Sequence, residues 1–152
     1  MRFFKSKKEP SFALPISNFK SYYAEFVPQL LEHYNYYKPS FFEALASEFL
    51  KSGKCASFTD ADLLENVTKE QAALALNHCM LIASARYNNS NAIFYAKSSG
   101  ARSVCINVEK PCKACSRVPK NKTYKTSAEI PLFPCLDCDQ EAICTFWYKI
   151  NF

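Results

Sequence analysis

Glycine and histidine are scarce in this sequence, since each occurs only twice in 152 residues. The sequence has no glycine-rich phosphate loop, no G-x-S-x-G and no H-E-x-x-H, the motifs typical of phosphate binding, serine hydrolysis and zinc proteolysis. Neither His33 nor His78 has an identifiable nucleophile or base partner near it in the sequence. These absences argue against the common enzyme classes.

Long hydrophobic runs are also missing. No stretch approaches the roughly 18 uninterrupted apolar residues of a membrane helix, and the basic start (residues 2–8) leads into proline-interrupted sequence rather than an apolar signal core. We therefore expect a cytoplasmic protein that does not bind membranes. With 49% hydrophobic and 15% aromatic residues, the chain can bury one good core, or a helical core plus a small metal-clamped unit.

Cysteine, in contrast, is abundant: five of the eight cysteines lie in the last 41 residues. Two C-x-x-C pairs, Cys112/Cys115 and Cys135/Cys138, are separated by 19 residues, a spacing that predicts a four-thiolate Zn²⁺ site. Cys144 is an alternative ligand that could replace Cys135 or Cys138, so the choice of four among five stays open. A tetrahedral site of this kind is closed to substrate, and its metal is structural.

Three other uses of these cysteines agree less well with the sequence. Disulfides need an oxidising compartment, for which the sequence offers no secretion signal. The P-C-x-x-C form matches the downstream half of the zinc deaminase signature. The upstream half requires a glutamate two residues after a histidine or cysteine ligand. Met80 occupies that position after His78, and Asn107 occupies it after Cys105. Thioredoxin-like chemistry requires a helix after the C-x-x-C, where Pro119 and a basic turn follow instead. The remaining cysteines, Cys55, Cys79 and Cys105, are expected to be small buried apolar residues.

Helical periodicity dominates the first hundred residues. Apolar residues recur at intervals of three and four from about Phe19 to Tyr87. Capping-box starts are predicted at Ser40, Thr59 and Thr68, and further breaks or starts at Pro28 and Ser90. We therefore expect four to five helices between residues 17 and 99.

The periodicity changes to two after Gly100, with a strand over residues 102–108, a short strand over 123–126 and a closing strand over 145–152. The sequence thus predicts an α+β protein. Its helical body covers residues 1–100 and a small zinc-ribbon-like or treble-clef-like β unit covers 101–152, the two packed as one compact protein.

Basic residues gather between the two cysteine pairs around one tyrosine. The candidates for contact with phosphate and for stacking on a base are Lys113, Arg117, Lys120, Lys122, Tyr124 and Lys125. Asp137, Asp139 and Glu141 near the second pair oppose this interpretation, so a nucleic-acid interface is the alternative rather than the first expectation.

Residues 100–148 resemble the cysteine-rich tail of phage Mu F-like head morphogenesis proteins. The resemblance rests on a helix stop at Gly100, a strand, the C-x-x-C at Cys112, Tyr124, and proline and cysteines that lead into an aromatic strand. The family commonly closes with C-R-C, whereas Cys144 is followed here by Thr145 and Phe146. The resemblance implies a structural zinc fold of phage or bacterial type.

The sequence therefore favours a non-enzymatic, zinc-stabilised interaction protein whose partner is another protein. The first alternative is a nucleic-acid-binding accessory protein that uses the basic loop 110–125, and the second is a metal- or thiol-dependent enzyme. The partner's identity and the oligomeric state are left open.

Overall fold

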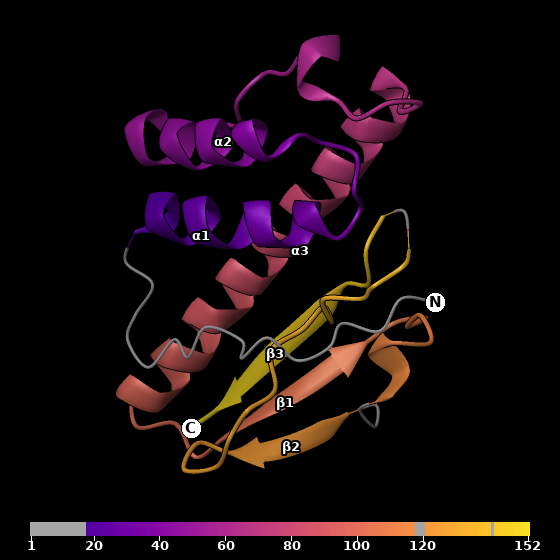
Figure 1. Ribbon diagram of the computed structural model, residues 1–152. Coiled ribbons are helices and arrows are strands. Elements are labelled where there is room, and N and C mark those ends of the chain that lie inside the picture. The colour runs from indigo at the N-terminus through magenta and orange to yellow at the C-terminus, as the bar shows by residue number, and fades with distance from the viewer. Residues whose placement is uncertain (1–17, 118–120, 141) are drawn as a thin grey trace. The chain divides into compact units, whose positions relative to one another are not determined.

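The computed structural model describes residues 18–117, 121–140 and 142–152 (Figure 1). In the described part of the chain the elements are three α-helices, three strands and two 3₁₀ turns: α1 (Phe19–Glu32), α2 (Pro39–Ser52), η1 (Asp60–Asp62), α3 (Lys69–Ser98), β1 (Ser103–Val108), η2 (Cys115–Arg117), β2 (Lys122–Lys125) and β3 (Phe146–Asn151). Contacts group these elements into two units, a helical unit (residues 18–83) and a sheet unit (residues 84–152). Helix α3 contributes its first half to one unit and its second half to the other.

The α+β class is confirmed, but the expectation of four to five helices is wrong, because two expected breaks do not occur. Pro28 lies inside the continuous helix α1. Its neighbours Val27, Leu30 and Leu31 are buried, and their packing outweighs the cost of a proline inside a helix, about 3 kcal/mol. Ser90 lies inside α3 and does not begin a new helix.

The helical unit has an aromatic core. Tyr37 stacks on Phe41 with ring centroids 4.6 Å apart, and Phe58 packs edge-on against both rings. The Tyr37 hydroxyl donates a hydrogen bond of 2.7 Å to the carbonyl oxygen of Ala72 in α3. This aromatic cluster therefore ties the segment before α2 to the start of the third helix. No helix within the described ranges is both long and apolar enough to cross a membrane.

The sheet is antiparallel, with β1 between β2 and β3 (Figure 1). In the register, Val104 lies opposite Tyr124 on one side and Ile150 on the other. Residues of β1 alternate between half-buried and buried, so Val104, Ile106 and Val108 point toward the core. The three expected strands are thus present, each within two residues of its predicted start and end. The division at residue 100 into a helical body and a β unit packed as one compact protein stays a prediction.

Candidate metal centre

Four cysteine side chains meet in the sheet unit. The Sγ atoms of Cys112, Cys115, Cys138 and Cys144 all lie within 4.8 Å of one another, and all four residues are buried. The Sγ atoms of Cys112 and Cys138 are 4.0 Å apart, far beyond a disulfide bond of about 2 Å. All eight cysteines of the chain are free thiols. We call these four residues the cysteine cluster, and their arrangement could hold a metal ion.

Tight turns carry the cysteines of the cluster. Lys110, two residues before Cys112, has a left-handed backbone with φ of 45°, and the carbonyl oxygen of Cys112 accepts the N–H of Ser116 at 2.9 Å. Ile143, immediately before Cys144, is also left-handed with φ of 38°. These turns direct both the first C-x-x-C and the last cysteine inward, although glycine, the usual residue for such backbone, is absent from both positions.

Each sulfur atom of the cluster accepts at least one backbone N–H. Cys112 Sγ accepts from Cys115 at 3.4 Å, Cys115 Sγ from Cys135 at 3.4 Å, and Cys138 Sγ from Cys144 at 3.4 Å. Cys144 Sγ accepts from the N–H of Cys112 at 3.1 Å. Peptide N–H groups directed at sulfur favour the thiolate form, the form that binds metal.

Burial of the cysteines and hydrogen bonds between their thiols act in the opposite direction, because they favour the protonated form. Burial raises the pKa of Cys144 to about 12, while the N–H of Cys112 lowers it. Hydrogen bonding with the Cys115 thiol raises the pKa of Cys138, and the N–H of Cys144 lowers it. Four thiolates this close together would repel one another in a dry site, so the cluster requires either protons or a cation.

Cys135 lies at the edge of the cluster. It is half-buried, its N–H contacts Cys115 Sγ, and its own thiol donates to the carbonyl oxygen of Ala114 at 3.5 Å. Hydrogen bonding with the Cys115 thiol lowers the pKa of Cys135. The structure thus brings together three of the four first-choice ligands with the alternative, Cys144. The choice of Cys135 as a ligand stays a prediction.

The segment that leads into the second cysteine pair is held from two sides. The guanidinium of Arg86 in α3 donates to the carbonyl oxygens of Leu132 and Pro134 at 3.1 and 2.8 Å, and Asn89 donates to Phe133 at 2.8 Å. From β3, the Tyr148 hydroxyl accepts the N–H of Phe133 at 2.9 Å and donates to Pro131 at 2.8 Å. Residues 131–134 therefore have a fixed path into Cys135.

Arg86 is only 3% exposed, and the sequence analysis missed it. Its position in the sequence could have identified it as a buried residue. Arg86 continues the buried stripe of Ala75, Cys79 and Ile82 at intervals of three and four. An arginine in an apolar helix stripe indicates a buried set of acceptors, and here these are carbonyl oxygens.

The basic residues proposed for nucleic-acid contact are dispersed in the structure. Arg117 forms a salt bridge of 3.0 Å with Asp137. Lys122 lies over the ring of Tyr124, 5.1 Å from its centroid, while Lys125 lies on the other side of the same strand. Lys113 is exposed beside Cys112. Lys120 lies outside the described residues.

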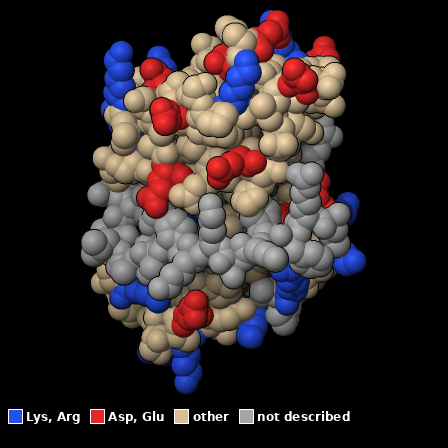
Figure 2. Space-filling view, viewed as in Figure 1, with Lys and Arg blue, Asp and Glu red and all other residues tan. Residues whose placement is uncertain are grey.

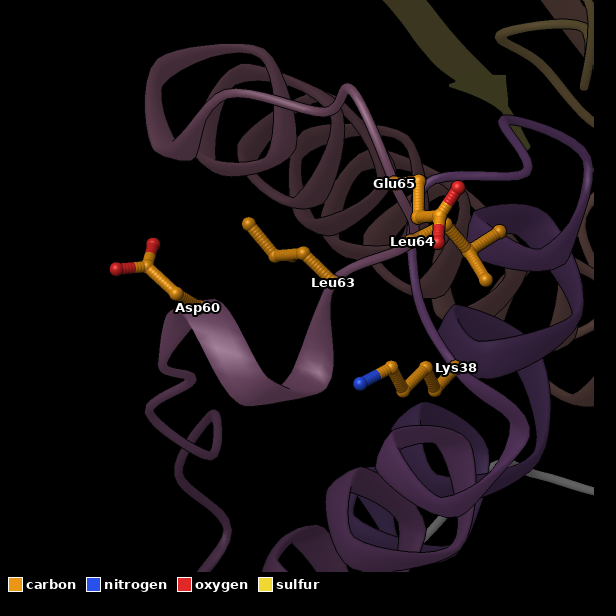
Figure 3. Close-up of a pocket in the computed structure, with 5 residues that line it drawn as sticks. All are labelled: Lys38, Asp60, Leu63, Leu64 and Glu65. Atoms are coloured by element: carbon orange, nitrogen blue, oxygen red, sulfur yellow. The ribbon is translucent and has the colours of Figure 1, made fainter.

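Of the three remaining cysteines, Cys79 is buried as expected and Cys105 is half-buried. Cys55 is exposed, so its expected burial is wrong. The helical unit also has an open hollow lined by Lys38, Asp60, Leu63, Leu64 and Glu65 (Figure 3). Two of its polar groups are already engaged, since Lys38 donates to the carbonyl oxygen of Ala61 at 2.6 Å and Asp60 pairs with Lys69 at 3.3 Å. The cysteine cluster is therefore the better candidate site.

No protein-family model, curated protein or solved structure matches this chain. The resemblance to the tail of phage Mu F-like proteins and the assignment to a zinc-ribbon fold thus gain no support from comparison. The function must be argued from the cysteine cluster itself.

Proposed function

We propose that the cysteine cluster binds one Zn²⁺ and that this metal is structural. One observation carries the proposal: each of the four sulfur atoms accepts a backbone N–H, so the fold directs a stabilising dipole at every ligand atom. Buried cysteines that serve only as small apolar residues do not need such donors. The pattern supports four thiolates that share a cation.

The size of the cluster fits zinc. A tetrahedral ion with Zn–S bonds of about 2.3 Å places its sulfur ligands about 3.8 Å apart. The Cys112–Cys138 separation of 4.0 Å is close to this value, and the largest separation of 4.8 Å requires only a small contraction. Thiolate ligands in a tetrahedral arrangement favour zinc over magnesium or calcium, which prefer oxygen.

Four protein ligands fill a tetrahedral ion and leave no position for substrate, so we propose a non-enzymatic role. In a small unit of this kind the free energy of metal binding contributes directly to folding. The protein would then be a zinc-stabilised interaction protein of zinc-ribbon-like character. The sequence favoured a protein as its partner, with nucleic acid as the alternative.

Native mass spectrometry of protein purified without added zinc tests the proposal. We expect one zinc per chain in the wild type, and loss or weakening of zinc in single serine variants of Cys112, Cys115, Cys138 and Cys144. Cys135→Ser is the matched control, because it removes a nearby thiol but keeps the N–H that contacts Cys115. Metal-free protein with masses lower by two units per cysteine pair would indicate disulfides and overturn the proposal.

A further inference from the structure

One side of the sheet is turned away from the buried side chains of β1. Alternate residues of the three strands form this side, which we call the open face: Ser103, Cys105, Asn107, Thr123, Lys125, Trp147, Lys149 and Asn151. None of these residues is buried. Trp147, the single tryptophan of the chain, is 48% exposed here. The exposed indole ring offers a flat aromatic surface on which a ligand could stack.

The register places complementary groups beside Trp147. Trp147 lies opposite Asn107, and Lys149, two residues farther along β3, lies opposite Cys105. A separation of two residues in a strand is about 7 Å, so the flexible lysine side chain can reach a ligand that covers the indole ring. On the other edge strand, Lys125 is paired with Ser103. The open face therefore combines one aromatic plane with two ammonium groups and neutral hydrogen-bonding side chains.

The two units of the chain carry net charges of opposite sign. Residues 84–152 contain ten Lys and Arg against five Asp and Glu, a net charge of +5, whereas residues 18–83 contain five against eight, a net charge of −3. In the view of Figure 2, aspartate and glutamate side chains lie mostly in the upper part, whereas lysine and arginine side chains are present in both the upper and the lower part. The sheet unit is thus basic although the helical unit is acidic.

Within the three strands, every charged side chain is basic. As the structure describes them, β1, β2 and β3 carry three lysines (Lys122, Lys125 and Lys149) and no aspartate or glutamate. The first acidic residue after β1 is Glu109, just beyond the end of that strand. A surface with this charge is complementary to a polyanion.

We propose that the open face binds single-stranded nucleic acid, with a base stacked on Trp147 and backbone phosphates paired with Lys149 and Lys125. Single strands expose the flat faces of their bases, and proteins bind them by combining aromatic stacking with basic side chains. A duplex hides its base faces, and an anion without bases would leave the indole unused. The inference depends on the proposed function only in that zinc keeps the sheet unit folded.

Trp147 provides a direct reporter, because it is the only tryptophan. Zinc-loaded protein of residues 1–152 is titrated at low salt with a 12-nucleotide mixed-sequence DNA or RNA strand. We expect quenching of the tryptophan fluorescence and an affinity that falls as salt is raised. With a fluorescein-labelled strand and anisotropy detection, Trp147→Leu should weaken binding about tenfold. Lys149→Ala should lower the slope of log K against log salt by about 0.7.

Lys97→Ala is the matched control, since it removes an exposed lysine from α3 within the same unit. It should bind like the wild type, and all variants should retain their zinc and circular dichroism. Absence of binding at low salt by zinc-loaded, folded protein would overturn this inference alone and favour a protein partner. Equal binding of heparin, or equal weakening by Lys97→Ala and Lys149→Ala, would also overturn it. Loss of zinc in the wild type would instead contradict the proposed function.

Discussion

The backbone N–H of Cys112 donates a hydrogen bond of 3.1 Å to Sγ of Cys144, although 32 residues separate them in the sequence. This contact joins the turn after β1 to the residues that enter β3. It places Cys144 beside Cys112 of the first cysteine pair, and it supplies a dipole that favours a charged sulfur. Loss of the Cys144 proton, which metal binding requires, would strengthen the same contact because a thiolate is a better acceptor than a thiol.

Zinc binding should release protons, and the zinc affinity should fall as the pH is lowered. In the absence of metal, burial raises the pKa of Cys144 to about 12, so this thiol is protonated at pH 7 and must lose its proton to bind metal. We expect more than one proton released per zinc at pH 7, measured in weakly buffered indicator solution. A zinc affinity unchanged between pH 8 and pH 5.5 would contradict thiolate ligation.

Arg86 should matter for the stability of the sheet unit and for zinc retention. Arg86→Met shortens the side chain only slightly but leaves the buried carbonyl oxygen of Pro134 and the part-buried one of Leu132 without this donor. We expect a loss of about 1–3 kcal/mol in the free energy of unfolding, together with faster zinc loss to a chelator. Arg86→Lys should recover part of both effects. If Arg86→Met unfolds like the wild type, the segment 131–134 does not depend on this arginine.

Gly53→Ala should destabilise the protein more than Gly100→Ala. Both glycines have left-handed backbone, with φ of 74° and 77°, so both substitutions incur about 1–2 kcal/mol. A Cβ at Gly53 would also lie 2.8 Å from the ring of Phe19, whereas a Cβ at Gly100 meets nothing within 4 Å. Chemical denaturation measures the difference. The excess cost of Gly53→Ala should disappear in a Phe19→Ala background, and an excess that persists would contradict the clash.

The helical unit should lose stability at alkaline pH through Cys79. Burial raises the pKa of Cys79 from 9.0 to about 12. The unfolded chain therefore releases this proton more readily than the folded chain, and stability that is present below pH 9 is lost between pH 9 and pH 12. We expect Cys79→Ala to be less stable at neutral pH but to show a smaller further loss at pH 10.5. Equal losses in both proteins would contradict this origin of the pH dependence.

Local sequence signals predicted several features well. The capping box at Thr59 is formed, as is the reciprocal pair in which Thr68 and Gln71 exchange backbone and side-chain hydrogen bonds of 3.1 and 3.2 Å. The predicted start at Ser40 was less accurate, since α2 begins at Pro39 without a side-chain cap. These signals depend on neighbours three or four residues apart, so the chain encodes them directly.

The sequence by itself determined that five cysteines near the C-terminus form a candidate metal site and that an α-helical region precedes a β region. The α+β class and the clustering of free thiols in the structure agree with this. Spacing between cysteines restricts which side chains can meet on one ion, and alternation restricts which can form a sheet. Both restrictions depend on the spacing of residues along the chain, so they can be recognised in the sequence.

Only the tertiary structure decided which cysteines meet, whether Pro28 and Ser90 interrupt helices, and what holds Arg86. Burial around Pro28 overrides a local helix-breaking preference. The cysteine cluster includes Cys144 because the turn at Ile143 and the N–H of Cys112, 32 residues away, direct its sulfur inward. Contacts between residues so distant in sequence depend on how the whole chain packs, and no local pattern of residues specifies them.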